Sequence, residues 1–304
     1  MTSAFHLQLL LFTVLGPGGA LGFVAASAFV VTAPKDAPWL FRLQRCLLLP
    51  IALCMLGLVI AATHLGTPRN ALYVLLGTGR SPLSNEMVAT ISFLALSWLF
   101  WLMLATRRLP VPVTKAWVAA ASVAALAMVR ETALAYSINT VPAWSLPVVP
   151  WMFWMGALVL GCAVAFCTLR IARVQVSAWS LLVLLGVQTA ALAAGVASMV
   201  LFRGGLEGVS SALGDAMTLV PGYGLYVAAF LLMGAVSVAC EARGLFRVGD
   251  KGPDGCRETG NDCTPPQVAD CPSVPRAALS VLLAAGAVVA MRVPFYLTYM
   301  TVGL

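Results

Sequence analysis

Eight apolar runs, each about 20 residues or longer, limit the fold of this chain more than any other feature of the sequence. A helix needs about 20 apolar residues to cross the hydrocarbon core of a bilayer, which is about 30 Å thick. Hydrophobic residues make up 61% of the 304 positions and charged residues only 10%, a composition outside the range of soluble domains. The sequence therefore predicts an all-α integral membrane protein with eight transmembrane helices.

The boundaries of these runs fall at charges or at proline and glycine. We expect the helices to span residues 6–31, 43–65, 86–106, 114–135, 148–169, 177–201, 221–240 and 277–299. The first run is too long for the apolar region of a signal peptide and has no Lys or Arg in residues 1–8, which favours a spanning helix. Residues 1–304 thus form a single polytopic domain, in which residues 241–276 are expected to be a flexible cytoplasmic loop between helices seven and eight.

The Lys and Arg residues predict the orientation of the protein. Thirteen of the 18 lie in or beside the connections that follow the first, third, fifth and seventh helices, and three lie on the other side. Because short cytoplasmic loops carry such an excess, both termini are expected on the periplasmic (outer) side. The basic residues form no continuous patch, which excludes nucleic acid as an expected partner.

This orientation brings the ionisable residues at the helix edges to one depth. His64 ends an outward-running helix, Glu86 starts an inward-running one, and Arg130 and Glu131 lie near the outward end of the fourth. Arg292 lies 15 residues into the last helix, roughly 22 Å from its inner end. Ionisable groups at membrane depth are costly and mark functional sites by default.

A structural role is the alternative for each of these residues. Arg130 could pair with Glu131 or Glu86 to neutralise itself, and His64 could lie in the headgroup region. Adjacent residues on a helix point about 100° apart, so we expect Arg130 and Glu131 to have different partners. That expectation favours a network over a single internal pair.

Four segments resemble the membrane anchor subunits of bacterial dimethyl sulfoxide reductases, which also have eight helices. They are HLGTPRNALY (64–73), LSNE (83–86), TVPAW (140–144) and the C-terminal RVPFYLTYMTVGL (292–304). The resemblance implies a multi-pass protein of the bacterial cytoplasmic (inner) membrane that oxidises menaquinol for an iron–sulfur subunit and a molybdopterin catalytic subunit. It also implies that this protein holds no haem and no metal of its own.

The resemblance assigns roles to particular positions. His64 and Glu86 match residues that the family associates with quinol, and Gly66, Pro68 and Arg69 complete the turn that follows His64. Residues Arg292 and Tyr296 match the C-terminal motif, together with the intervening Pro294 and Phe295. The sequence departs from the family at Thr67 and near Thr301, where an arginine is usual, and near Pro82 and Asn85, where the family has an aromatic and a basic residue.

Quinol oxidation suits these side chains. It removes two electrons and two protons, so the site needs a hydrogen-bond partner, a proton acceptor and an apolar slot. A neutral His64 can hydrogen-bond a quinol hydroxyl, and a partly desolvated Glu86 can accept a proton, its affinity for protons raised by burial and lowered by nearby Arg69 or Arg130. Tyr73, Trp98, Trp144 and Tyr296 are candidates to line the slot, although membrane-interface belts use the same residue types.

Two other functions remain open from the sequence. A proton-coupled secondary transporter could use the same ionisable layer, but such folds show inverted repeats and broken helices at mid-membrane. The protein could also be a passive anchor without a quinone site.

Other sequence features favour packing over chemistry. Five of the eight cysteines lie in or beside apolar runs, and Cys256, Cys263 and Cys271 lack metal-ligand spacing in a reducing compartment. Gln188 is expected to hydrogen-bond a neighbouring helix. The small residues from Gly19 to Ala28 are expected to permit close helix packing, with a transmembrane dimer face as the alternative.

Overall fold

A computed structural model describes residues 3–63, 68–106, 109–175, 177–211, 214–249 and 274–299 of the protein. Eight helices in these ranges are long and apolar enough to cross a membrane, which confirms the predicted number of spans. The helices are α1 (Ser3–Thr32), α2 (Leu40–Cys46), α3 (Leu48–Ala62), α4 (Pro82–Thr106), α5 (Val111–Ala135), α6 (Val149–Ile171), α7 (Ala178–Leu206), α8 (Tyr223–Gly249) and α9 (Val274–Leu297). Together α2 and α3 make one span.

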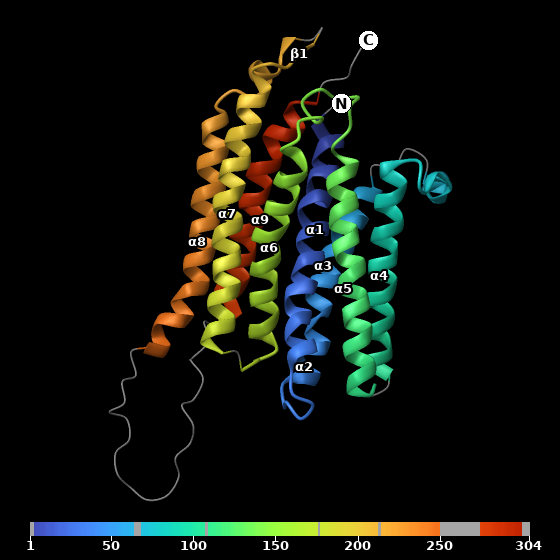
Figure 1. Cartoon of the computed structure of the whole chain (residues 1–304), viewed down its shortest axis with the longest axis vertical. Coiled ribbons are helices and arrows are strands. Elements are labelled where there is room, and N and C mark those ends of the chain that lie inside the picture. Colours follow the sequence, from blue (N-terminus) through green and yellow to red (C-terminus); the bar gives the residue numbers. More distant parts are fainter. Residues whose placement is uncertain are drawn as a thin grey trace, which may run out of the picture.

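Short elements join the spans at one end of the bundle. A 3-10 helix, η1 (Pro68–Gly77), precedes α4. A two-stranded hairpin of β1 (Ser210–Ser211) and β2 (Gly214–Asp215) and a second 3-10 helix, η2 (Ala216–Leu219), lie between α7 and α8. We call this end of the bundle upper and the other end lower, as they are drawn in Figure 1. The first helix begins and α9 ends at the upper end.

The bundle is built around α1 and α6. Helix α1 contacts α3, α5, α6 and α9, while α6 also contacts α7 (Figure 1). The first five helices share one apolar core with the lower half of α6, and α6 to α9 share a second core with the upper parts of α1 and α5. Helices form throughout because, inside a bilayer, every backbone polar group must be satisfied within its own segment.

Glycines let α1 approach its neighbours closely. A Cβ atom on Gly19 would lie 2.7 Å from the carbonyl oxygen of Pro50 in α3, and one on Gly161 of α6 would lie 2.7 Å from Leu21 Cβ. Gly22 faces Val164 of α6 in the same way. The small-residue run is therefore used for packing inside one molecule, as predicted.

The structure shifts several predicted boundaries. Helix α8 continues to Gly249 and α9 begins at Val274, so both edges of the predicted 241–276 loop are helical. The rest of that segment, including Cys256, Cys263 and Cys271, lies outside the described residues. Arg170, which falls just beyond the predicted helix 148–169, lies inside α6 and is only 7% exposed.

Candidate functional site

A buried carboxyl lies near the upper end of α4. Glu86 is 1% exposed, and its Oε1 has no hydrogen-bond partner among the described residues. Thr132 of α5 faces this carboxyl, and Glu131 is close enough for its charge to act on it. The hydroxyl of Thr132 is also buried without a hydrogen bond of good geometry in the described part of the protein. The predicted burial of Glu86 is therefore confirmed, with polar groups left free around it.

A buried guanidinium lies at a similar depth in α9. Arg292 is 0% exposed, its Nη2 donates to the carbonyl oxygen of Phe153 at 3.3 Å, and its Cζ lies 3.7 Å from the Phe153 ring centroid. Its Nε and Nη1 have no partner among the described residues. A cation–π contact offsets only part of the cost of burying a charge. Such an incompletely satisfied cation in a membrane protein is a candidate for a functional site.

Two buried tyrosines, Tyr136 and Tyr296, lie within electrostatic reach of both Glu86 and Arg292. The Tyr296 hydroxyl is 3.3 Å from Thr13 Oγ1, and the Tyr136 and Tyr296 rings meet edge to face with centroids 6.1 Å apart. Burial raises the pKa of the Tyr136 phenol well above its usual value; Tyr296 and Glu86 raise it further, and Arg292 lowers it. Tyr136 thus stays a neutral hydrogen-bonding group within electrostatic reach of both charged side chains.

Aromatic rings close the site and join two of the sequence motifs. Trp144 of the TVPAW segment stacks on Phe295 of the RVPFY segment with centroids 4.6 Å apart, and its Nε1 donates to Phe295 O at 3.0 Å. Tyr136 stacks on Phe153 with centroids 5.2 Å apart. Pro294, inside α9, has no N–H for the carbonyl of Ala290 and so loosens the helix beside Arg292. The TVPAW and RVPFY segments, whose contact residues Trp144 and Phe295 are 151 positions apart in the sequence, therefore form one aromatic wall of the site.

The connection before Glu86 is tied to α4. Asn85 Oδ1 accepts a hydrogen bond from the backbone N–H of Gly79 at 2.7 Å, and a Cβ on Gly77 would lie 2.5 Å from Ser84 Oγ. Helix η1 therefore packs against the first turns of α4. His64 and Gly66 lie outside the described residues, as do the side chains of Pro68 and Arg69, although Pro68 begins η1.

The prediction that Arg130 and Glu131 have different partners is wrong. Arg130 Nη1 and Glu131 Oε1 form an ion pair, in which the Arg130 side chain is 64% exposed and that of Glu131 17%. Among the described residues, no other carboxylate lies within ion-pair distance of the exposed Arg130 guanidinium. A contact of Arg130 or Glu131 with a ligand stays a prediction.

Two of the four predicted slot residues lie elsewhere. Trp98 lies 16 residues into α4, roughly 24 Å from its upper end, and packs edge to face on Trp101. Tyr73 is 65% exposed on η1. Trp144 and Tyr296 are buried in the wall. Tyr136, Phe153 and Thr132 were not predicted from the sequence, although Tyr136 and Thr132 both lie at the upper end of α5, the helix that carries Glu131.

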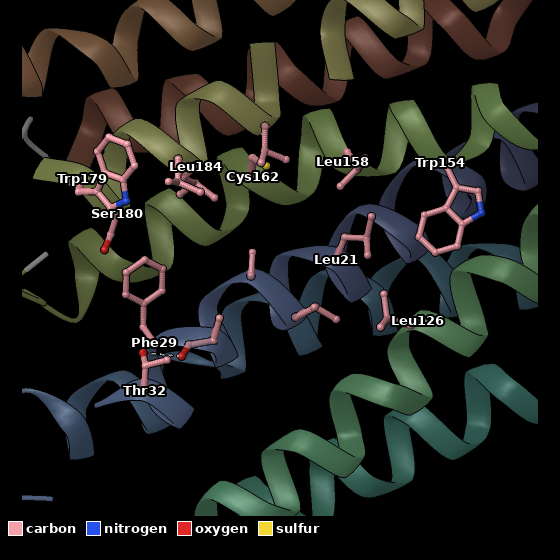
Figure 2. A pocket seen from close by; sticks show the side chains of 15 residues that line it. Leu21, Phe29, Thr32, Leu126, Trp154, Leu158, Cys162, Trp179, Ser180 and Leu184 are labelled. Carbon is pink, nitrogen blue, oxygen red and sulfur yellow. Dashed lines mark hydrogen bonds between the residues drawn. The ribbon is translucent and has the colours of Figure 1, made fainter. Parts of the chain in front are cut away.

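An apolar groove runs below this site (Figure 2). It has a volume of about 510 Å³ and lies between α1, α5, α6 and α7. Trp154 and Leu126 line one end, and Trp179, Ser180 and Thr32 line the other. Trp154 follows Phe153 in α6, so this end of the groove lies at the same height as the wall of the site.

A comparison with known families decides what kind of protein carries this site. A family model described as the DMSO reductase anchor subunit (DmsC) matches residues 1–248. This protein belongs to the DMSO reductase anchor subunit family. The match includes the His64–Glu86 segment and all of α1 to α7, and it confirms the family suggested by the sequence motifs.

Individual relatives of the anchor agree with the family match. The protein is 25% identical over 228 residues to the C subunit of anaerobic dimethyl sulfoxide reductase of Haemophilus influenzae, covering 74% of this sequence and 79% of the relative. It is 29% identical over 215 residues to the YnfH subunit of anaerobic dimethyl sulfoxide reductase of Escherichia coli, covering 71% of this sequence and 74% of the relative. It is 27% identical over 240 residues to the C subunit of anaerobic dimethyl sulfoxide reductase of Escherichia coli, covering 78% of this sequence and 83% of the relative.

Proposed function

We propose that this membrane anchor binds and oxidises menaquinol at the upper end of its bundle and passes the electrons to an iron–sulfur subunit. That subunit would in turn supply a molybdopterin catalytic subunit. Membership of the anchor family supports a place in such a complex. The Lys and Arg distribution supports an upper end that faces the periplasm.

One observation carries the proposal. Glu86 and Arg292 are both buried, lie roughly 6 Å and 8 Å from the upper ends of their helices, and keep unpartnered polar atoms within the described part of the protein. The side chains of Tyr136 and Tyr296 lie within electrostatic reach of both. Buried polar groups without partners cost free energy, so their retention at one depth favours a ligand that supplies the missing hydrogen bonds.

A quinol supplies the complementary groups. Its two hydroxyls can accept from the guanidinium of Arg292 and donate to the carboxylate of Glu86, while its apolar ring fits against the aromatic wall. Oxidation to the quinone releases two protons and two electrons. Glu86 takes one proton, and His64, in the connection between α3 and η1, takes the other. The isoprenoid tail is apolar, as is the groove that begins at Trp154.

Protons and electrons would leave on the same side of the membrane. Glu86 lies near the upper end of the bundle, where the periplasmic water is closest in the proposed orientation. The partner subunits dock at that face in the proposed complex. Turnover would therefore separate no charge across the membrane by itself.

The substitution Glu86→Gln tests the proposal, because it keeps the shape of the side chain and removes the proton acceptor. Quinol-dependent turnover of the assembled complex should fall about a hundredfold or more. An artificial donor that reduces the iron–sulfur subunit directly should still drive the complex at the wild-type rate. His64→Ala should show the same contrast between the two donors.

The control is Glu207→Gln, at an exposed carboxyl just beyond the upper end of α7. It should change neither rate. Quinol-dependent turnover of Glu86→Gln within about twofold of wild type would show that Glu86 is not the proton acceptor. The passive-anchor alternative would then be favoured.

A further inference from the structure

A second buried polar cluster lies in the lower half of the bundle, where the proposed quinol chemistry has no use for it. Glu241 of α8 is 1% exposed, and it is surrounded by Gln188 of α7, Ser237 of α8 and Ser280 of α9, each at most 1% exposed. The sequence-based placement of Glu241 in a loop is wrong, whereas the expected interhelical hydrogen bonding of Gln188 is confirmed. The cluster joins three helices whose contributing residues are far apart in the sequence.

Both side chains that donate to Glu241 reach the same carboxyl oxygen. Ser280 Oγ donates to Oε1, and Gln188 Nε2 donates to Oε1 at 3.4 Å. The Ser237 hydroxyl donates to the carbonyl oxygen of Ser280 at 3.0 Å. Within the described residues, Glu241 Oε2 has no partner. An ionised carboxylate needs donors on both oxygens, whereas a carboxylic acid has one acceptor oxygen and one O–H.

An unpartnered acceptor completes the pattern. Gln188 Oε1 is buried and has no hydrogen-bond partner among the described residues, although the Nε2 of the same amide bonds to Glu241 Oε1. A single proton on Glu241 Oε2 could donate to Gln188 Oε1 and satisfy both atoms. The acid and the amide would then be joined by two hydrogen bonds in a ring, which resolves two otherwise costly buried groups.

No cation in the described residues takes the place of that proton. Arg170 of α6 is close enough to act on Glu241 electrostatically, but it forms no ion pair with it. The Arg170 guanidinium instead lies 4.8 Å from the Phe166 ring centroid, and its Nη2 has no partner in the described part of the protein. The other titratable groups that interact electrostatically with Glu241 are Cys162 and Cys167 of α6. Helices α7 and α9 face it with the neutral side chains of Gln188 and Ser280.

We propose that Glu241 is a proton-binding site of the lower half of the membrane, held as a carboxylic acid and sharing its proton with Gln188. The proton exchanges with water at the lower end, which is the nearer one, because Glu241 lies roughly 12 Å from the lower end of α8 and roughly 27 Å from its upper end. The upper site lies too far away to take part. Ser280 and Arg292 are 12 residues apart on α9, roughly 18 Å, and the buried residues of α9 between them are apolar (Ala284, Ala287, Val288 and Met291).

Infrared difference spectroscopy tests this site in the purified anchor complex. The spectrum of wild type minus Glu241→Gln should contain the C=O band of a protonated carboxyl at neutral pH, and this band should shift after transfer to D₂O. Carboxylate bands in the difference spectrum would overturn the proposal. So would conversion of the protonated carboxyl to a carboxylate on addition of sodium, because the cluster would then be a cation site. A protonated band that does not shift in D₂O would overturn exchange with water.

Two further variants keep the test decisive if Glu241→Gln fails to fold. Gln188→Leu removes the acceptor of the proposed O–H, and Ser280→Ala removes a donor to Oε1, so each should keep the protonated C=O band and move it to higher frequency. An unchanged band position in Gln188→Leu would contradict the proposed ring, whatever Ser280→Ala shows. Quinol-dependent turnover should stay at the wild-type rate in Gln188→Leu, which separates this proton site from the proposed quinol chemistry.

Discussion

At the scale of single residues, the role proposed for Arg292 in quinol binding would be maintained at a cost to stability. Its guanidinium is fully buried with one backbone hydrogen bond and one aromatic contact, and no carboxylate among the described residues neutralises it. Removing a buried charge that lacks a partner is often neutral or stabilising when an apolar side chain of similar volume replaces it. Stability and activity should therefore separate at this position.

The substitution Arg292→Met tests that separation. The melting temperature of the anchor should stay the same or rise, because the desolvation cost of the guanidinium disappears. Quinol-dependent turnover should fall about tenfold or more, since a hydrogen bond from a charged group to the quinol is lost. Thermal unfolding in detergent and a quinol assay measure the two effects.

A matched control is Arg203→Met, at an exposed arginine in the upper part of α7. This change should leave turnover unaltered. A large loss of melting temperature in Arg292→Met, together with wild-type turnover in the molecules that remain folded, would show that Arg292 has a structural role only.

Single residues are also the hardest feature to predict from the sequence. Glu86 and Arg292 can be found because charges inside apolar runs stand out. Tyr136 cannot, because a tyrosine at a helix end looks like an interface residue. Glu241 follows an apolar run and its charge suggests the start of a loop, although its spacing of four from Ser237 places both on one face of α8.

At the scale of elements, close contacts of α1 hold the two halves of the bundle together. Gly19 packs on the backbone of α3, and Gly22 and Gly161 bring α1 and α6 together. Association of helices within lipid depends on such packing, because lipid tails are as apolar as the side chains. The glycines are therefore expected to matter more than the lipid-facing leucines of the same helices.

The pair Gly19→Ala and Gly186→Ala tests this dependence. The new Cβ at position 19 would lie 2.7 Å and 2.8 Å from backbone atoms of α3, so overpacking should cost about 1–3 kcal/mol of unfolding free energy. The new Cβ at position 186 meets no atom within 4 Å, so the better helix propensity of alanine should leave stability equal or slightly higher.

Thermal or denaturant unfolding in detergent measures both variants. Equal stability of the two would contradict the packing role of Gly19.

The number and order of the spans are predictable because hydropathy reports burial in lipid directly. The contact between α1 and α6 is not, because many pairings of eight helices satisfy the same hydropathy pattern.

At the scale of the whole molecule, orientation links the two polar clusters to the two sides of the membrane. The upper end holds Glu86 and Arg292, and the lower end holds Glu241. The Lys and Arg excess predicts that the lower end is cytoplasmic. A reporter enzyme active only outside the cytoplasm should be active when fused after Leu304 and silent when inserted near Asp254. The reverse pattern would place the proposed quinol site at the cytoplasmic face.

The position of bound quinone tests the central claim most directly. A photoreactive menaquinone analogue, activated in membranes that contain the assembled complex, should label peptides from the upper ends of α4, α5 and α9. Excess menaquinone should prevent the labelling, and Arg292→Met should weaken it. Labelling confined to the lower half of the bundle, or to the partner subunits alone, would contradict a quinol site between Glu86 and Arg292.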